Sequence, residues 1–242
     1  MYQISKTHTQ YWYGEPIGVI VLEARYPCIP GNVANASTFD FPVRYESACG
    51  GSIEGLLGKH DESMLDGFIA AARNLESAGV KAITGACGFM ALFQNQVQHA
   101  VDVPVFLTSL LQIPFIHQIT GKQVGVITAN NESLTRMDLA DIGINHTDFV
   151  SIGLEDDPAF TSGVLDESGT LDSAAIEEEV VAKARHLLKD NPDVGAILLE
   201  CSDLPPYSHR LQREFGLPVF DYTTMIRHVV STVMHRPYEG IY

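Results

Sequence analysis

Two cysteines occupy equivalent positions in a repeated stretch of this sequence. The stretch VKAITGACGFMALFQNQVQHAVDVPVF (80–106) aligns without a gap with VGAILLECSDLPPYSHRLQREFGLPVF (194–220). The alignment pairs Cys87 with Cys201, and each lies 17 residues before the proline of a PVF segment, from 87 to 104 and from 201 to 218. Cysteine is rare here, with four in 242 residues. A matched pair within a repeat therefore favours a functional role over inert packing.

Two opposed thiols are suited to moving a proton across a planar carbon. One thiolate removes a proton from a carbon next to a carboxylate or carbonyl group, and the opposite thiol protonates the other face. The enediolate formed between these steps needs preorganised donors. We expect them to be the backbone N–H groups of Gly88, Phe89, Ser202 and Asp203. If each cysteine begins a helix, the helix N-terminus also lowers the pKa of the thiol. This chemistry requires no cofactor.

Four more polar residues lie near expected strand ends and are candidates for binding the substrate. Glu23 and Arg25 end the first expected strand, and the Arg25 guanidinium could hold a carboxylate, with a surface ion pair as the alternative. Asn32 lies in the long loop that follows, where a turn role is the alternative. Thr128 ends the first strand of the second half and could line the same site.

The elements that must position these residues alternate along the chain. Apolar, β-rich runs are separated by segments of helical periodicity, which predicts a parallel α/β fold. The runs that open the two halves contain the matching triplets 18–20 and 125–127. We therefore expect two similar parallel-sheet domains related by a pseudo-twofold axis. Ligands bind at the carboxyl ends of such strands, so the active site is expected in the cleft between the domains, where Cys87 and Cys201 would meet.

The domain boundaries are predicted from this repeat. The first domain, which carries Cys87, should span residues 1–118 and be completed by a C-terminal helix at about 221–242. The second domain, which carries Cys201, should span residues 119–220. Residues 155–179 hold nine acidic residues and no basic one, and we expect them to form a solvated loop and helix start.

Composition narrows the classes of partner. The formal net charge is −15 at pH 7, which disfavours nucleic acids and anionic membranes because phosphate contacts need clustered Lys and Arg. No apolar run approaches the roughly 20 residues of a membrane helix. The first residues lack the apolar stretch of a signal peptide, so we expect a cytoplasmic protein.

No CxxC or HxxxH pair in the sequence supports a metal site. For Cys28 and Cys49, inert packing is the expected role.

The two halves, each with a strand-end cysteine, resemble the aspartate/glutamate racemase superfamily. The resemblance covers roughly residues 17–233, and GACGFMALFQ and LLECSDLPPY stand where that family has its two cysteine motifs. It implies that Cys87 and Cys201 are the two acid/base residues, that the protein is a homodimer, and that the loop of Glu23 and Arg25 contacts the substrate. The polar side chains that follow the cysteines in glutamate racemases are largely missing. The sequence is therefore nearer to hydantoin racemases and arylmalonate decarboxylase.

The leading hypothesis is a cofactor-independent racemase or epimerase acting on a small carboxylate or amide, such as an amino acid or a hydantoin. A decarboxylase or a maleate-type cis–trans isomerase on the same fold is the alternative. A cysteine hydrolase is less favoured, because Phe89 replaces the last glycine of a nucleophile elbow and Cys201 would have no role. A non-catalytic binding protein would be recognised by unreactive cysteines.

Overall fold

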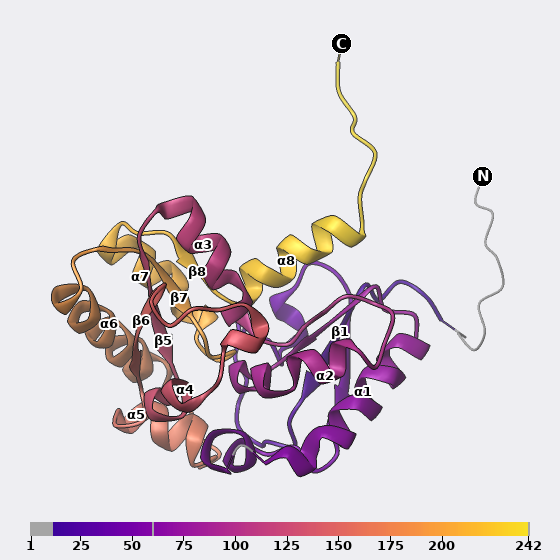
Figure 1. Ribbon diagram of the computed structural model, residues 1–242, viewed down its shortest axis with the longest axis horizontal. Coiled ribbons are helices and arrows are strands. Elements are labelled where there is room, and N and C mark those ends of the chain that lie inside the picture. The colour runs from indigo at the N-terminus through magenta and orange to yellow at the C-terminus, as the bar shows by residue number, and fades with distance from the viewer. Residues whose placement is uncertain (1–11, 60, 242) are drawn as a thin grey trace.

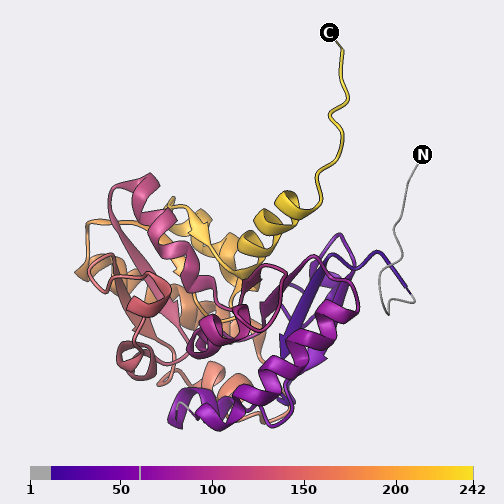
Figure 2. The same ribbon diagram turned by 45° about the vertical axis from the view of Figure 1, so that its right-hand side comes forward.

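The computed structural model describes residues 12–59 and 61–241, and the expected domain ends at residues 1 and 242 lie outside this part of the chain. The chain forms two lobes side by side, each built on a four-stranded parallel sheet (Figures 1 and 2). The first sheet has the order β2-β1-β3-β4, with β1 Ile17–Val21, β2 Val43–Ser47, β3 Ala82–Gly85 and β4 Val105–Phe106. The second has the order β6-β5-β7-β8, with β5 Gln123–Thr128, β6 Phe149–Gly153, β7 Val194–Leu199 and β8 Val219–Phe220. The predicted fold of two similar parallel α/β halves is confirmed.

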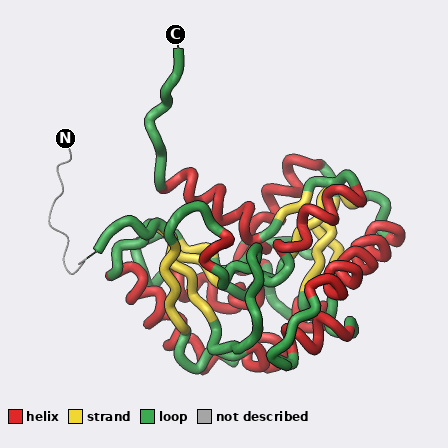
Figure 3. The backbone as a smooth tube through the Cα atoms, turned by 180° about the vertical axis from the view of Figure 1, so that it is seen from behind, coloured by secondary structure: helices red, strands yellow, loops and turns green. Residues whose placement is uncertain are grey.

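The two sheets repeat one another in register as well as in strand order. Ile83 pairs with Val105 in the first sheet, and Ile197 pairs with Val219 in the second. These are the residues that the gapless alignment equates. The sheets are seen as two separate groups of strands from behind, with loops running between them (Figure 3). The duplication is therefore preserved in the backbone hydrogen bonding of the sheets.

Helices pack on the sheets of both lobes. The α-helices are α1 Leu65–Ser77, α2 Gln94–Gln98, α3 Ile113–Thr120, α4 Asn131–Arg136, α5 Pro158–Phe160, α6 Ser173–Asp190, α7 Ser208–Phe215 and α8 Tyr222–Val233. The 3₁₀ turns are η1 Ala36–Thr38, η3 Glu62–Met64, η4 Gly88–Phe93, η5 Ser109–Gln112, η6 Ala140–Ile142 and η8 Pro205–Tyr207, and the π turns are η2 Gly55–Lys59 and η7 Thr161–Leu165.

The long helices of the two lobes approach their sheets closely at equivalent glycines. A Cβ on Gly18 of β1 would lie 2.9 Å from a Leu75 methyl of α1, and a Cβ on Gly125 of β5 would lie 2.7 Å from a Leu187 methyl of α6. Glycine at both positions lets the leucines pack directly on the strand backbone. This close packing fixes the central strands, β1 and β5, beside the cysteine-bearing strands β3 and β7.

The last helix returns to the first lobe. Tyr222, Met225 and Ile226 of α8 form a separate buried cluster with Ile17 and Val19 of β1. The opposite-facing Ile20 of β1 belongs to the main core with Phe68 and Leu75 of α1, because successive strand residues point to opposite faces. The first sheet is therefore sandwiched between α1 and α8. We expected the helix to continue to about residue 242, but it ends at Val233, ahead of Pro237, which a helix interior tolerates poorly.

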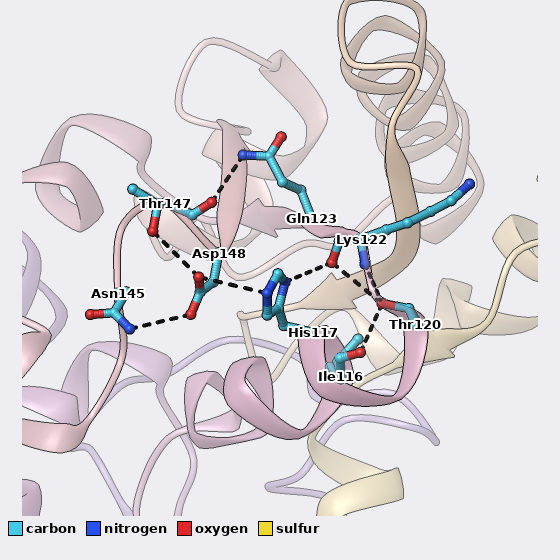
Figure 4. A network of polar contacts seen from close by, with 8 residues as sticks. All are labelled: Ile116, His117, Thr120, Lys122, Gln123, Asn145, Thr147 and Asp148. Atoms are coloured by element: carbon cyan, nitrogen blue, oxygen red, sulfur yellow. Dashed lines mark hydrogen bonds and ion pairs between the residues drawn. The ribbon is translucent and has the colours of Figure 1, made fainter.

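A polar network ties the crossover between the lobes to the second sheet (Figure 4). His117, at the end of α3, has its Nδ1 2.9 Å from the carbonyl oxygen of Lys122. A carbonyl only accepts hydrogen bonds, so Nδ1 carries the proton. The Nε2 of the same ring is 3.9 Å from Asp148, just before β6, and Gln123 donates to the carbonyl of Thr147 at 3.0 Å. These contacts fix the start of β5, and hence the strand that runs beside Cys201.

Candidate active site

The structure places the two matched thiols on one cavity between the lobes. Cys87 follows β3 and Cys201 follows β7, and both line a cavity of about 30 Å³. In each half the residue before the cysteine donates its backbone N–H to the end of the central strand, Ala86 to Ile20 and Glu200 to Ile127, both at 2.9 Å. Each cysteine therefore lies at the point where the pairing of its strand with the central strand ends. This is the edge of a parallel sheet at which ligands bind.

Matching turns follow the two cysteines. The carbonyl oxygen of Cys87 accepts the N–H of Met90 at 3.1 Å, and that of Cys201 accepts the N–H of Leu204 at 3.2 Å. The turn after Cys87 continues as the 3₁₀ helix η4, while the α-helix after Cys201, α7, begins only at Ser208. Neither thiol lies at the N-terminus of an α-helix, which differs from the expectation from sequence.

Burial dominates the acidity of both thiols. It raises the pKa of Cys87, and the neighbouring Glu200 carboxylate raises it further, while the backbone N–H groups of Phe89 and Met90 favour the thiolate. Burial also raises the pKa of Cys201, where Asp203 and Glu200 add to the effect. The expectation of a lowered thiol pKa was wrong, because one short turn of aligned N–H groups does not offset desolvation beside carboxylates.

Cys201 is hydrogen-bonded to a buried carboxylate. Its Sγ lies 3.4 Å from Oδ2 of Asp203, which also accepts the Tyr26 hydroxyl at 3.0 Å. The Nδ2 of Asn32 donates to Oδ1 of the same carboxylate, and the Asn32 Oδ1 is itself held by the N–H of Ala34 at 2.7 Å. Burial raises the pKa of Asp203 to about 6, although its three donors oppose that shift. The thiol proton is therefore already directed at a fixed acceptor.

Glu200 is a second buried carboxylate at the cavity, and its side chain is fully inaccessible to solvent. Its Oε2 accepts the Thr128 hydroxyl at 2.9 Å, and its Oε1 has no hydrogen-bond partner among the described residues. Burial raises its pKa to about 7, while Thr128 and the N–H of Ala129 act in the opposite direction. Sequence reasoning missed Glu200. The signal was an acid at the end of the apolar run VGAILLE, aligned with Ala86 of the other half.

Six of the residues predicted for the site line the cavity together: Cys87, Gly88, Phe89, Cys201, Ser202 and Asp203. Asn32 reaches it through Asp203, and Thr128 stands behind Glu200. Glu23 and Arg25 do not belong with them, because both are exposed and neither lines the cavity. The residues of this loop that line the cavity are Leu22 and Tyr26, and neither was predicted.

The two halves of the chain line the cavity with different kinds of side chain, and only the second half contributes carboxylates. The first half contributes Ala86, Cys87, Gly88 and Phe89, whereas the equivalent positions of the second hold Glu200, Cys201, Ser202 and Asp203. No lysine or arginine lines the cavity among the residues whose side chains the structure describes. A site with two carboxylates and no basic side chain favours a substrate that carries a positive charge.

Glu200 should make the stability of the protein depend on pH. Its pKa lies near 7 in the folded chain and near 4.3 in an unfolded one, so its contribution to stability is present at low pH and lost as the pH rises through about 7. We expect Glu200→Gln to raise the free energy of unfolding above pH 8 by up to about 3 kcal/mol, and by much less at pH 5. Urea unfolding at both pH values measures this. Glu62→Gln, at an exposed position, is the control and should show neither gain.

Residues 155–179, the acidic stretch that we expected to form a solvated loop and helix start, also make contacts at the cavity. Val164 and Leu165 of η7 line the cavity, and Glu167 accepts the backbone N–H of Arg25 from the other lobe at 2.6 Å. Glu167 has a φ of 50°, which is unusual for a residue other than glycine. A cavity of about 30 Å³ holds only about two water molecules. We therefore expect a larger substrate to enter when these segments move apart.

Breaking this contact should open the cavity more often. We expect Glu167→Ala to increase the rate at which a small alkylating reagent modifies Cys87 and Cys201 by about three- to tenfold, since a charged acceptor of one backbone N–H is lost. The adduct at each cysteine is measured by peptide mass spectrometry. Arg25→Ala is the matched control, because the donor is its backbone N–H and survives the substitution. If Cys87 and Cys201 are alkylated at the same rate in Glu167→Ala and in the unsubstituted protein, the contact does not hold the cavity closed.

Two observations bear on other classes of function. In the described ranges, no three His, Cys, Asp or Glu side chains come together as a metal site would require. Over those same residues, no helix combines the length and the apolar character needed to cross a bilayer.

Comparison with known proteins gives matches over most of the chain. The family model described as Asp/Glu/hydantoin racemase matches residues 62–228. Dimethylsulfoniopropionate lyase 3 of Emiliania huxleyi (strain CCMP1516) is 33% identical over 238 residues, which cover 93% of this chain and 61% of that protein. This chain thus spans about three fifths of that relative. A dimethylsulfoniopropionate lyase of Durusdinium sp. clade D is 30% identical over 243 residues, covering 93% of this chain and 80% of that protein.

Solved structures give the same fold at lower identity. Unliganded arylmalonate decarboxylase has a TM-score of 0.62 at 18% identity, covering 93% of this chain and 94% of the other. Allantoin racemase from Klebsiella pneumoniae has a TM-score of 0.58, also at 18% identity, with 93% and 95% covered. The fold is therefore shared by enzymes with different reactions.

Proposed function

The chain belongs to the Asp/Glu/hydantoin racemase family, and from that premise we propose that it is a cofactor-independent lyase acting on dimethylsulfoniopropionate. This substrate has a carboxylate at one end and a positively charged dimethylsulfonium group at the other. Removal of the proton next to the carboxylate, with loss of the sulfonium group from the adjacent carbon, gives acrylate and dimethyl sulfide.

The observation that carries the proposal is the charge of the cavity. Glu200 and Asp203 are buried acids on its wall, Tyr26 adds an aromatic ring, and no described lysine or arginine lines it. Dicarboxylates such as malonates, aspartate or glutamate would place further negative charge against these acids. A sulfonium zwitterion places a cation there instead, and the relatives of 30 and 33% identity carry the name of that substrate.

In this mechanism Cys201 is the base, because it is the thiol that the structure joins to a carboxylate. The Cys201 proton passes to Asp203, and the thiolate takes the proton from the carbon beside the substrate carboxylate. The electron pair of that C–H bond forms the C=C bond, and the electron pair of the C–S bond leaves with dimethyl sulfide. The proton held by Asp203 then returns to solvent. Backbone N–H groups of the turns after Cys87 and Cys201 are the proposed donors to the substrate carboxylate, where negative charge develops.

A racemase or epimerase is the second candidate, favoured by one observation. Both thiols line the same cavity, and a two-base inversion uses both, whereas an elimination uses one. Under this alternative Cys87 and Cys201 would exchange protons with opposite faces of one carbon, as the sequence alone led us to expect.

The test is to incubate the purified chain with dimethylsulfoniopropionate and to measure dimethyl sulfide by gas chromatography and acrylate by liquid chromatography. The lyase proposal expects equal amounts of both products. Parallel incubations in D2O with hydantoins and free amino acids report racemisation through deuterium at the α-carbon, and arylmalonates report CO2 release. Racemisation or decarboxylation without any dimethyl sulfide would refute the lyase proposal and identify the activity that replaces it.

A further inference from the structure

Glu200 carries an unneutralised oxygen in an otherwise paired site. The residue has no solvent exposure, and burial raises its pKa to about 7, although Thr128 and the N–H of Ala129 oppose that shift. Its Oε1 accepts no hydrogen bond from any described residue. A buried carboxylate oxygen without a donor is costly, and the side chain lies on the wall of the cavity that also holds both thiols.

The other carboxylate of the cavity is in a different situation. Asp203 accepts hydrogen bonds from Tyr26, Cys201 and Asn32, which engage both of its oxygens. No described lysine or arginine lines the cavity to balance Glu200. Glu200 is therefore the acid of the cavity whose ionised form a cationic ligand would stabilise.

The backbone of the turn after Cys87 leaves room for this oxygen, because the residue beside it is a glycine. A Cβ on Gly88 would lie 1.8 Å from Oε1 and 2.3 Å from the carboxyl carbon of Glu200. Only glycine permits that approach, and Gly88 directly follows Cys87. The carboxylate thus lies against the turn after one thiol while it precedes the other in sequence.

Taking the elimination above as the reaction, we propose that Glu200 is the residue that selects the cationic leaving group, with its Oε1 facing the sulfonium. The remaining wall suits the two methyl groups of such a cation, because Leu22, Ile53, Leu57, Ala129, Val164 and Leu165 present apolar side chains. A sulfonium group has no N–H or O–H, so it is recognised through charge and apolar contact. The unpaired Glu200 oxygen would supply the charge, and the apolar wall around it would supply the contact with the methyl groups.

The experiment compares two non-cleavable ligands that differ only in charge. One is propanoate with a trimethylammonium group on its β-carbon, and the other is its carbon isostere with a tert-butyl group there. Dissociation constants are measured by isothermal titration calorimetry for the unmodified protein and for Glu200→Gln. We expect the unmodified protein to bind the cationic ligand about 10- to 100-fold more tightly than its isostere, and Glu200→Gln to reduce that ratio to near one.

A matched control is available elsewhere in the fold. Glu155 also has a buried oxygen without a partner and lies against a glycine, since a Cβ on Gly153 would be 1.7 Å from its Oε2, but it does not line the cavity. Glu155→Gln should keep the full preference for the cation. Thermal unfolding of both variants verifies that each is folded.

The outcomes separate this proposal from the reaction itself. If dimethyl sulfide is produced but Glu200→Gln keeps the preference for the cationic ligand, the role of Glu200 is refuted and the elimination stands. If no dimethyl sulfide forms but the preference is large and disappears in Glu200→Gln, the cation site stands and the elimination is refuted. The proposal would also be refuted if Glu155→Gln removed the preference for the cationic ligand as completely as Glu200→Gln does. The loss of preference would then not depend on a carboxylate that lines the cavity.

Discussion

Replacing Cys201 with alanine is expected to lower kcat/KM for the elimination by about a hundred- to ten-thousandfold, the usual contribution of a positioned acid or base. The thiol is the only group in the mechanism that touches the substrate proton, and its partner Asp203 is 3.4 Å away. Cys201→Ser should lose nearly as much, since a hydroxyl is far less acidic than a thiol. The measurement is the initial rate of dimethyl sulfide release over a range of substrate concentrations.

Three further variants test whether the loss is specific to Cys201. Asp203→Asn should produce a comparable loss, because the amide no longer accepts the thiol proton, and Cys49→Ser, at an exposed cysteine, should be neutral. Cys87→Ala should cost less than Cys201→Ala if one thiol is the base, whereas two-base racemisation requires equal losses. Retention of more than about a tenth of kcat/KM in Cys201→Ala would contradict its assigned role.

Replacing Gly88 with alanine is expected to be the most damaging change of a single methyl group in the site. The added Cβ would meet the Glu200 carboxylate at 1.8 Å and the Glu200 carbonyl oxygen at 2.7 Å. Relieving that overlap moves either the turn after Cys87 or the end of β7, which carries Cys201. We expect a loss of about 3 kcal/mol or more in the free energy of unfolding, together with loss of activity.

The Gly88 prediction has an internal check. The double variant Gly88→Ala with Glu200→Ala should recover part of the stability, because it removes the carboxylate but not the backbone carbonyl contact. Gly58→Ala is the control, since the nearest atom to its Cβ would be 3.9 Å away. Thermal and urea unfolding give the comparison. A Gly88→Ala protein as stable as the Gly58→Ala protein would show that the turn accommodates a side chain.

The duplication is what made the fold and the cysteine pair predictable. Backbone pairing depends on the spacing of apolar residues, which both halves retain, so aligning Cys87 with Cys201 also aligned the registers of their strands. Asp203 and Ser202 were found because they follow a cysteine directly. The repeat therefore predicted the strand register and the positions of the two cysteines.

Features that depend on burial were not predictable in this way. Glu200 ends a strand, where an acid normally reaches water, and it is buried because Gly88 has no side chain and the two lobes close over it. A helix follows each cysteine, but neither thiol lies at the N-terminus of an α-helix, and the expected lowering of the thiol pKa was wrong for a related reason. Desolvation between two lobes is a property of their packing, whereas a motif describes only one chain segment. Arg25 was expected at the site but is exposed, whereas Tyr26 of the same loop was not predicted and lines the cavity.

The return of α8 to the first lobe has a consequence for how the protein is made. The buried cluster around Ile17 and Val19 on β1 is incomplete until Tyr222 and Ile226 are available. On a ribosome, where domains generally fold as units while the chain emerges, the second lobe has all of its strands by Phe220. The first lobe still lacks its closing helix at that point. The half that is translated first is thus completed last, when α8 packs against its sheet.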